Sequence, residues 1–136
     1  MNNIEKLNET CRNTLVENLG IEFTAIGEGW LEAKMPIDSR TVRPDGLLHG
    51  GANMALAETI GGALSFIFVP DEFDVFGIEI NGNHMKQARG SYVTGRGKFI
   101  HKGNRTHVVE VEIKDESGSL VTVNRVTNIV VRKTAN

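Results

Sequence analysis

Two periods of hydrophobic residues run along the chain, and they predict its helices and strands. In residues 3–19 the apolar positions stand three or four apart and stop before Gly20, which predicts an amphipathic N-terminal helix within residues 1–20. Later segments alternate apolar and polar residues, as strands do. These segments are a hairpin over 21–37 that turns near Gly27-Glu28-Gly29, a short strand over 75–81, and longer strands over about 91–100, 106–114 and 119–132.

The predicted strands follow one another without alternating helices, which favours an antiparallel meander and an α+β fold class. The segment 106–114 is the clearest, because His107 and Val109 fall on one face while Glu110 and Glu112 fall on the other. Residues 52–69 differ, since they are nearly all apolar or small and predict a helix buried on most sides. We therefore expect a long curved antiparallel sheet wrapped around one central helix.

The composition fits a single domain over residues 1–136. The net charge of −2 lacks the basic excess that a broad nucleic-acid footprint needs. Cys11 has no second cysteine to pair with, and the four histidines lack the close spacing of a zinc site, so we expect no metal or other cofactor. Glu58 and the Gly61-Gly62 pair argue against a membrane span over 52–69. The first residues lack an apolar signal-peptide core, so we expect a cytoplasmic protein.

Glu58 is the one ionisable side chain between His49 and Asp71, in the middle of the apolar helix. Carboxylates are seldom buried unless they are paired or take part in chemistry. Desolvation in an apolar cleft raises the pKa of a carboxyl group, which suits a general base or a nucleophile. The structural alternative is that Glu58 lies at the edge of the helix or forms a salt bridge within the core.

The same helix begins behind a glycine-rich loop, Gly46-Leu47-Leu48-His49-Gly50-Gly51. The first N–H groups of a helix have no partner within it, and Gly50 and Gly51 leave them uncovered. Such a place binds an anion or the developing oxyanion of an attacked carbonyl. The structural alternative is a loop that needs glycine backbone angles, with His49 as a helix cap.

The spacing along this helix predicts a site shared between two chains. His49 and Glu58 are nine residues apart, which is about 13 Å of helical rise and about half a turn out of phase. A carbonyl that is held on one side and attacked from the other needs both groups within about 3 Å of the reacting atoms. Two chains related by a two-fold axis can supply Gly50 from one and Glu58 from the other.

Several motifs resemble those of hotdog-fold acyl-CoA thioesterases, over about residues 20–132. The resemblance rests on the run Arg43-Pro44-Asp45-Gly46-Leu47-Leu48-His49-Gly50-Gly51-Ala52, followed by Leu56-Ala57-Glu58-Thr59. It extends to Gly77-Ile78-Glu79-Ile80-Asn81-Gly82-Asn83-His84 and to His101-Lys102-Gly103-Asn104-Arg105. The chain is similar to the branch that acts on aromatic acyl-CoAs, such as 4-hydroxybenzoyl-CoA and 1,4-dihydroxy-2-naphthoyl-CoA.

The resemblance implies a hotdog fold and the hydrolysis of an acyl-CoA thioester with an aromatic acyl group to a free acid and CoA. It gives Glu58 the role of general base or nucleophile, and it makes the Gly50 N–H the group that polarises the carbonyl. It gives His49 a supporting role. It also implies homodimers, often paired into homotetramers, with the sites at the subunit interface.

Three positions depart from the family pattern. Arg43 stands where relatives often carry Gln or Asn near the carbonyl, and we expect it to orient the acyl group together with His49. Gly62 stands one turn after Glu58, where some relatives carry a Ser or Thr that positions water. Asp45 stands where aromatic-specific relatives often carry an apolar residue.

Binding of CoA requires positive charge for its phosphates. We expect Gly51 and His84 near the substrate, the latter by resemblance, although His84 is also typical of a surface histidine. The candidates for phosphate contacts are the basic side chains Lys86, Arg89, His101, Lys102 and Arg105. Each of them is also typical of a solvated charged loop.

Two other functions stay open. A hotdog dehydratase or hydratase of acyl thioesters would need a His/Glu or His/Asp pair that reaches the α- and β-carbons of its substrate. A non-catalytic acyl-CoA-binding module would bind the ester without turnover, and Arg43 and Gly62 are compatible with it. Product analysis separates these functions, because free CoA appears only on hydrolysis.

Overall fold

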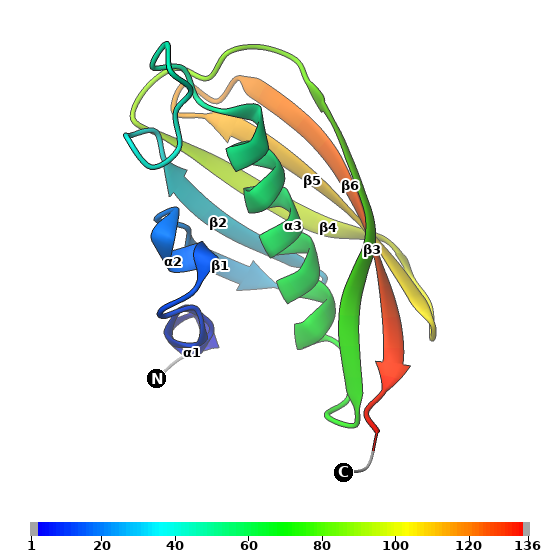
Figure 1. The fold of residues 1–136 in the computed structure, drawn as a ribbon. Coiled ribbons are helices and arrows are strands. Elements are labelled where there is room, and N and C mark those ends of the chain that lie inside the picture. Colours follow the sequence, from blue (N-terminus) through cyan, green and yellow to red (C-terminus); the bar gives the residue numbers. More distant parts are fainter. Residues whose placement is uncertain (1–2, 135–136) are drawn as a thin grey trace.

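A curved antiparallel sheet holds one long helix in its hollow (Figure 1), in a computed structural model that describes residues 3–134. The helix, α3, spans Gly50–Ile67 and packs against β2 to β6. This arrangement confirms the predicted α+β class and the predicted central helix. The strands are β1 (Glu22–Gly27), β2 (Trp30–Pro36), β3 (Phe73–His84), β4 (Tyr92–Lys102), β5 (Thr106–Asp115) and β6 (Leu120–Arg132).

The strand order is β1-β2-β4-β5-β6-β3, so the chain crosses the whole sheet between β2 and β3. Only β4, β5 and β6 form the predicted meander, whereas β3 leaves it and becomes an edge strand. Within the described part of the chain, β3 pairs with β6 alone, and its other edge carries unpaired backbone groups. The alternation of residues predicts strands but does not specify their neighbours, so this edge position could not be predicted.

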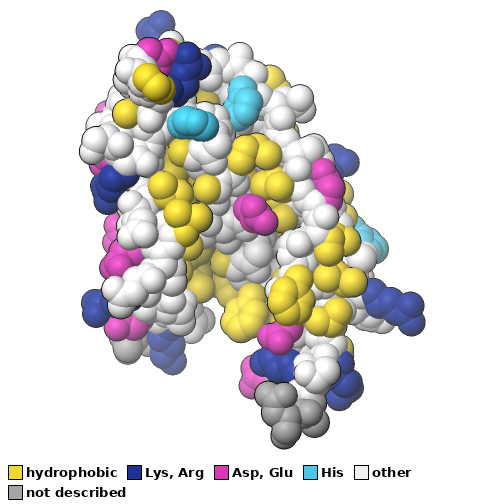
Figure 2. Space-filling view, in the orientation of Figure 1, with side chains coloured by type: hydrophobic (Ala, Val, Ile, Leu, Met, Phe, Trp, Pro, Cys, Tyr) yellow, Lys and Arg dark blue, Asp and Glu magenta, His cyan; other side chains and the backbone are white. Residues whose placement is uncertain are grey.

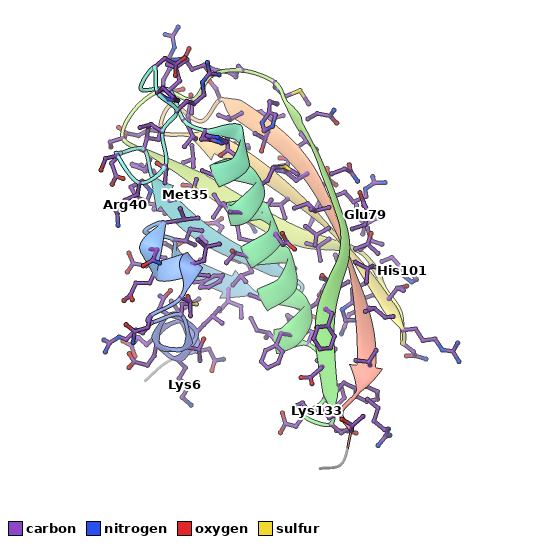
Figure 3. All side chains as sticks on the ribbon, in the orientation of Figure 1. Lys6, Met35, Arg40, Glu79, His101 and Lys133 are labelled. Carbon is purple, nitrogen blue, oxygen red and sulfur yellow. The ribbon has the colours of Figure 1, made fainter. Side chains whose placement is uncertain are left out.

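The core forms where α3 lies on the sheet. Leu56, Ile60 and Leu64 stand four residues apart on one face of α3, and all three are completely buried. Gly95 and Gly97 on β4 make room for this face, because a Cβ atom on either would lie 2.6 Å from an Ile60 side-chain atom. Met35, from β2, belongs to the same core (Figure 3). No helix within residues 3–134 is long and apolar enough to cross a membrane.

The N-terminal segment differs from the single helix that the periodicity predicts. It forms α1 (Asn3–Thr10) and α2 (Leu15–Asn18), separated by a turn. Asn13 adopts a left-handed backbone with φ of 60°, and its N–H donates to Glu17 Oε2 at 2.7 Å. The Thr14 hydroxyl donates to the carbonyl of Cys11. Asn tolerates the left-handed backbone, and the Thr hydroxyl readily takes a local carbonyl as partner, which divides the helix without removing its apolar side from the core.

Candidate active site

The first turn of α3 leaves one backbone donor free. His49 caps the helix, since its Nδ1 accepts a hydrogen bond from the Gly51 N–H at 2.8 Å. The N–H groups of Ala52 and Asn53 donate to the carbonyl of His49. Among the described residues, none accepts from the Gly50 N–H, which is therefore available at the positive end of the helix. The capping role considered for His49 is confirmed, and the cap uses Nδ1 and not Nε2.

Two glycines at this turn lie close against histidine rings, which leaves little room for a side chain at either position. A Cβ atom on Gly50 would lie 3.0 Å from both Cε1 and Nε2 of His84, so the His84 ring covers Gly50. A Cβ atom on Gly51 would lie 2.9 Å from Nδ1 of His49. The structure thus brings His84, at the end of β3, to the start of α3. Gly50 and His84 border a cavity of about 330 Å³ that Arg43, Asn53 and Lys86 also line.

Arg43 and Asp45, two of the departures from the family pattern, form one ion pair. Their closest atoms, Arg43 Nη2 and Asp45 Oδ2, are 2.6 Å apart, and Arg43 Nε donates to Asp45 Oδ1 at 3.1 Å. The hydrogen bond from Arg43 lowers the pKa of Asp45 below its usual value. Asp45 therefore compensates the charge that Arg43 adds beside the cavity.

Glu58 is exposed, which corrects the expectation of a buried carboxylate. It lies on α3 beside β3, where a Cβ atom on Gly77 would be 3.3 Å from Glu58 Oε1. No described residue forms a hydrogen bond or ion pair with Glu58, so the alternative of a core salt bridge is wrong, whereas the helix-edge alternative holds for this chain. The sequence around Glu58 is apolar on all sides, but β3 ends the sheet and leaves this side of α3 uncovered.

Hydrophobic side chains gather on the same face, between α3 and β3 (Figure 2). We call four exposed residues the apolar band: Phe66, Ile67, Ile78 and Met85. Ile78 and Met85 are more than half exposed, at 58% and 55%. Large exposed apolar surface that adjoins a free strand edge is typical of an interaction site.

The basic candidates fall into two groups. Lys86 lines the cavity at the start of α3, and its Nζ is 3.7 Å from Asp115 Oδ2, which also accepts from the Arg89 N–H. Lys102 lies near the other end of the helix, with its Nζ 5.0 Å from the centre of the Phe68 ring. The remaining two members, His101 and Arg105, are exposed at the β4–β5 turn, and Figure 3 shows His101 far from the start of α3. One chain does not bring these groups together.

Residues 45–122 match the family model described as the thioesterase superfamily. The chain belongs to the thioesterase superfamily. It is 44% identical over 127 residues to the 1,4-dihydroxy-2-naphthoyl-CoA hydrolase of Escherichia coli K12, and the match covers 93% of each chain. It is 42% identical over 127 residues to the proofreading thioesterase EntH of Cronobacter turicensis, again over 93% of each chain.

A solved thioesterase structure from Haemophilus influenzae superposes on this thioesterase with a TM-score of 0.94 at 41% identity, covering 97% of this chain and 92% of that chain. The predicted family and its hotdog fold are therefore confirmed, and the protein is an enzyme of the thioester-hydrolase class.

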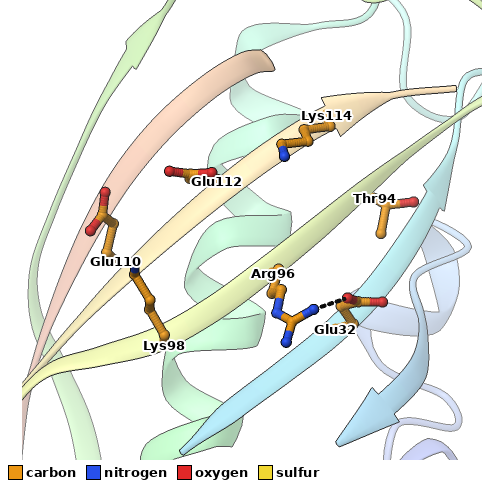
Figure 4. A pocket seen from close by; sticks show the side chains of 7 residues that line it. All are labelled: Glu32, Thr94, Arg96, Lys98, Glu110, Glu112 and Lys114. Carbon is orange, nitrogen blue, oxygen red and sulfur yellow. Dashed lines mark hydrogen bonds and ion pairs between the residues drawn. The ribbon is translucent and has the colours of Figure 1, made fainter. Parts of the chain in front are cut away.

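The outer face of the thioesterase sheet also has a cavity, but charged and polar side chains line it (Figure 4). Seven polar side chains of β2, β4 and β5 line a cavity of about 300 Å³: Glu32, Thr94, Arg96, Lys98, Glu110, Glu112 and Lys114. Arg96 Nη1 pairs with Glu32 Oε2 at 3.1 Å and lies over the Trp30 ring. Because acidic and basic residues stand opposite each other across the strands, this face compensates its own charges and lies on the side of the sheet away from α3.

Two asparagines near the site were not predicted from the sequence. Asn53 Oδ1, on α3, and Asn128 Oδ1, on β6, are buried and have no hydrogen-bond partner among the described residues. The sequence feature that could have identified them is a polar residue at an inward-facing position of an apolar pattern, as at His107. His107 is indeed buried as expected, and burial is the main cause that lowers its pKa.

Proposed function

We propose that this enzyme hydrolyses an aromatic acyl-CoA thioester to the free acid and CoA. The observation that carries the proposal is the carboxylate of Glu58, which lies beside the apolar band on α3. Within residues 3–134 it has no hydrogen-bond or ion-pair partner, and none of these residues accepts from the Gly50 N–H in the first turn of the same helix. An apolar surface suits an aromatic acyl group, and one similar chain is named a hydrolase of an aromatic acyl-CoA.

Glu58 and Gly50 have different roles in the proposed reaction. The Gly50 N–H donates to the thioester oxygen and stabilises the negative charge that develops there, with support from the positive end of α3. Glu58 removes a proton from the attacking water or attacks the acyl carbon directly. In the first route, breakage of the carbon–sulfur bond releases the acid, and the proton taken from water passes to the departing thiolate of CoA. In the second route, breakage of that bond leaves a mixed anhydride on Glu58, which a water hydrolyses to the acid and free Glu58 while the released proton passes to the thiolate.

We further propose that each site needs two chains. Glu58 follows Gly50 by eight positions on α3, about 12 Å of helical rise, so one helix cannot present both to the same carbonyl. A second copy of the chain, added across a two-fold axis at the free edge of β3, would cover the apolar band. The enzyme would then be a homodimer, or a homotetramer of two such dimers.

The same arrangement would give CoA its cationic contacts. Lys86 lies near the start of α3, and Arg89 lies beside Asp115, the ion-pair partner of Lys86. Lys102 lies near the other end of α3, next to His101 and the β4–β5 turn with Arg105. An antiparallel pairing of two β3 strands places opposite ends of the two protomers side by side. Both groups could then contact the phosphates of one CoA, while Arg43, His49, Gly51 and His84 orient the thioester. The chemistry requires no metal or other cofactor.

The two alternative functions, a dehydratase and a binding module without turnover, have less support from the structure than hydrolysis has. A dehydratase needs a histidine beside its carboxylate, but no described histidine forms a hydrogen bond with Glu58, and His49 Nδ1 is occupied by the helix cap. A binding module without turnover would not need an unpaired carboxylate beside the apolar band.

Replacement of Glu58 by Ala tests the proposal. We expect the release of the CoA thiol from benzoyl-CoA to fall by at least roughly 100-fold, which is the low end of the effect of a general base. Glu28→Ala, at the exposed β1–β2 turn, is the matched control and should keep full activity. A folded Glu58→Ala variant that hydrolyses benzoyl-CoA at the wild-type rate would refute the mechanism.

A further inference from the structure

Two oxygen acceptors face the same point beside β3. A Cβ atom built on Gly77 would lie 3.3 Å from Glu58 Oε1 and 3.6 Å from Asn128 Oδ1. Apart from Gly77 and its chain neighbours, no other described heavy atom lies within 4 Å of that position. Because Gly77 has no side chain, these two oxygens are the nearest atoms opposite β3 at this position.

The orientation of the Asn128 amide is fixed from the opposite side. Its Nδ2 donates to the carbonyl of Gly61 at 3.0 Å and to the hydroxyl of Ser65 at 2.8 Å. These two bonds determine which end of the amide is nitrogen, so Oδ1 must face Gly77 and Glu58. Asn128 is completely buried, and its Oδ1 accepts from no described residue. A buried acceptor of this kind calls for a donor.

Water is the donor that fits two acceptors. It carries two hydrogens, one for Asn128 Oδ1 and one for the Glu58 carboxylate. Glu58 is an exposed side chain, so it can turn outward to admit the water without disturbing the core. A water that gives both hydrogens to these oxygens directs its lone pairs away from them, as a nucleophile must.

We propose that Asn128 is a positioning residue, which holds the attacking water of thioester hydrolysis against Glu58. The inference rests on the proposed function. The water oxygen bonds to the acyl carbon as Glu58 takes its proton; the carbon–sulfur bond then breaks, and the proton passes to the thiolate of CoA. Asn128 thereby supplies the hydrogen bond that a hydroxyl at position 62 would give, because Gly62 has no side chain.

Two substitutions remove the water in different ways. Asn128→Leu removes the acceptor, and Gly77→Ala fills the space from the other side without altering the hydrogen bonds of Asn128. Gly77 does not have the positive φ of a left-handed residue, so alanine can adopt its backbone conformation. With each variant we expect kcat to fall roughly 10- to 100-fold at unchanged KM, the effect of losing an oriented hydrogen bond to the nucleophile.

Asn124→Leu is a matched control for Asn128→Leu. Asn124 is also a buried β6 asparagine with an unpartnered Oδ1, but that oxygen faces Gly82 instead of Glu58. We expect this variant to lose stability, as Asn128→Leu does, and to keep the wild-type kcat.

Rescue separates positioning from a structural role. A Cβ atom on Gly62 would meet nothing within 4 Å, so a serine fits there. We expect Gly62→Ser to restore part of the kcat of the Asn128→Leu variant, and Gly62→Ala, which adds no hydroxyl, to restore none.

The inference is overturned if Asn128→Leu and Gly77→Ala both keep the wild-type kcat while Glu58→Ala abolishes hydrolysis, and this result would leave the proposed function intact. Equal rescue by Gly62→Ser and Gly62→Ala would also overturn it, because the hydroxyl would then be irrelevant. If the wild-type enzyme releases no thiol from any aromatic acyl-CoA, the proposed function itself fails. If Asn128→Leu does not fold, Gly77→Ala alone decides.

Discussion

Gly61 and Gly62 are neighbours on α3 but meet opposite surroundings, and this contrast gives a quantitative prediction. A Cβ atom on Gly61 would lie 2.8 Å from Val126 Cβ and 2.9 Å from Val126 Cγ2, on β6. Both are stiff atoms of a β-branched side chain, so the contact can be relieved only if α3 moves away from the sheet. A Cβ atom on Gly62 would meet nothing within 4 Å.

Alanine gains helix propensity at both positions, by about 0.8–1 kcal/mol relative to glycine. Gly62→Ala should keep this gain in the free energy of unfolding. Gly61→Ala should lose about 1–3 kcal/mol through overpacking, so its net effect lies between about zero and about 2 kcal/mol of destabilisation. Because the propensity gain cancels between the two variants, their difference of about 1–3 kcal/mol measures the overpacking alone.

Urea unfolding followed by far-ultraviolet circular dichroism measures this difference. All variants must be compared at one protein concentration, since subunit association would make the apparent stability depend on it. Equal shifts for both variants, or a Gly61→Ala variant that is as stable as Gly62→Ala, would show that α3 does not approach β6 as closely as these contacts require.

Three further predictions concern acid stability, association and the oxyanion donor. The pKa of Asp115 is lowered to about 2, chiefly by the hydrogen bond from the Ser117 hydroxyl, so the native state binds fewer protons than the unfolded state. Its stabilisation is complete above the ordinary value of 3.8 and is lost as the pH falls through about 2. Asp115→Asn should therefore weaken the acid dependence of urea unfolding below pH 4, and an unchanged dependence would assign it to other groups. Ile78→Asp places a charge in the apolar band and should give monomers in sedimentation velocity, whereas intact dimers would exclude this band as the interface. Gly50→Ala keeps the backbone N–H but pushes against the His84 ring at 3.0 Å and should lower kcat/KM by roughly tenfold or more; wild-type activity would show that hydrolysis does not depend on the packing of His84 over the Gly50 N–H.

Local patterns predicted most of the elements. The alternation around His107 and Val109 defined β5, and the turn over 115–118 is held by Asp115, whose Oδ1 accepts from the N–H groups of Ser117 and Ser119. Such features depend on residues within a few positions of one another. The break between α1 and α2 was missed because the apolar spacing continues through it, while Asn13 and Thr14 form local hydrogen bonds instead.

The site depends on contacts between segments that are far apart in the sequence. Glu58 was expected to be buried because its helix is apolar all round, but the crossing to β3 leaves that side of α3 open. Asn128 lies 70 positions after Glu58 in the sequence, and only the pairing of β6 with β3 brings its amide beside Gly77. Register across strands is set by tertiary packing, so no local pattern could reveal this proximity.

Subunit mixing tests the central claim most directly, that each site combines Glu58 of one chain with Gly50 of another. Glu58→Ala subunits are mixed in equal amounts with Gly50→Val subunits, whose side chain would displace the His84 ring, and thiol release from benzoyl-CoA is measured after subunit exchange. Half of the dimers would be mixed, and each would contain one intact site, so we predict about a quarter of the wild-type activity from two inactive parents. A mixture that stays inactive although fluorescent labels prove the exchange would contradict a shared site.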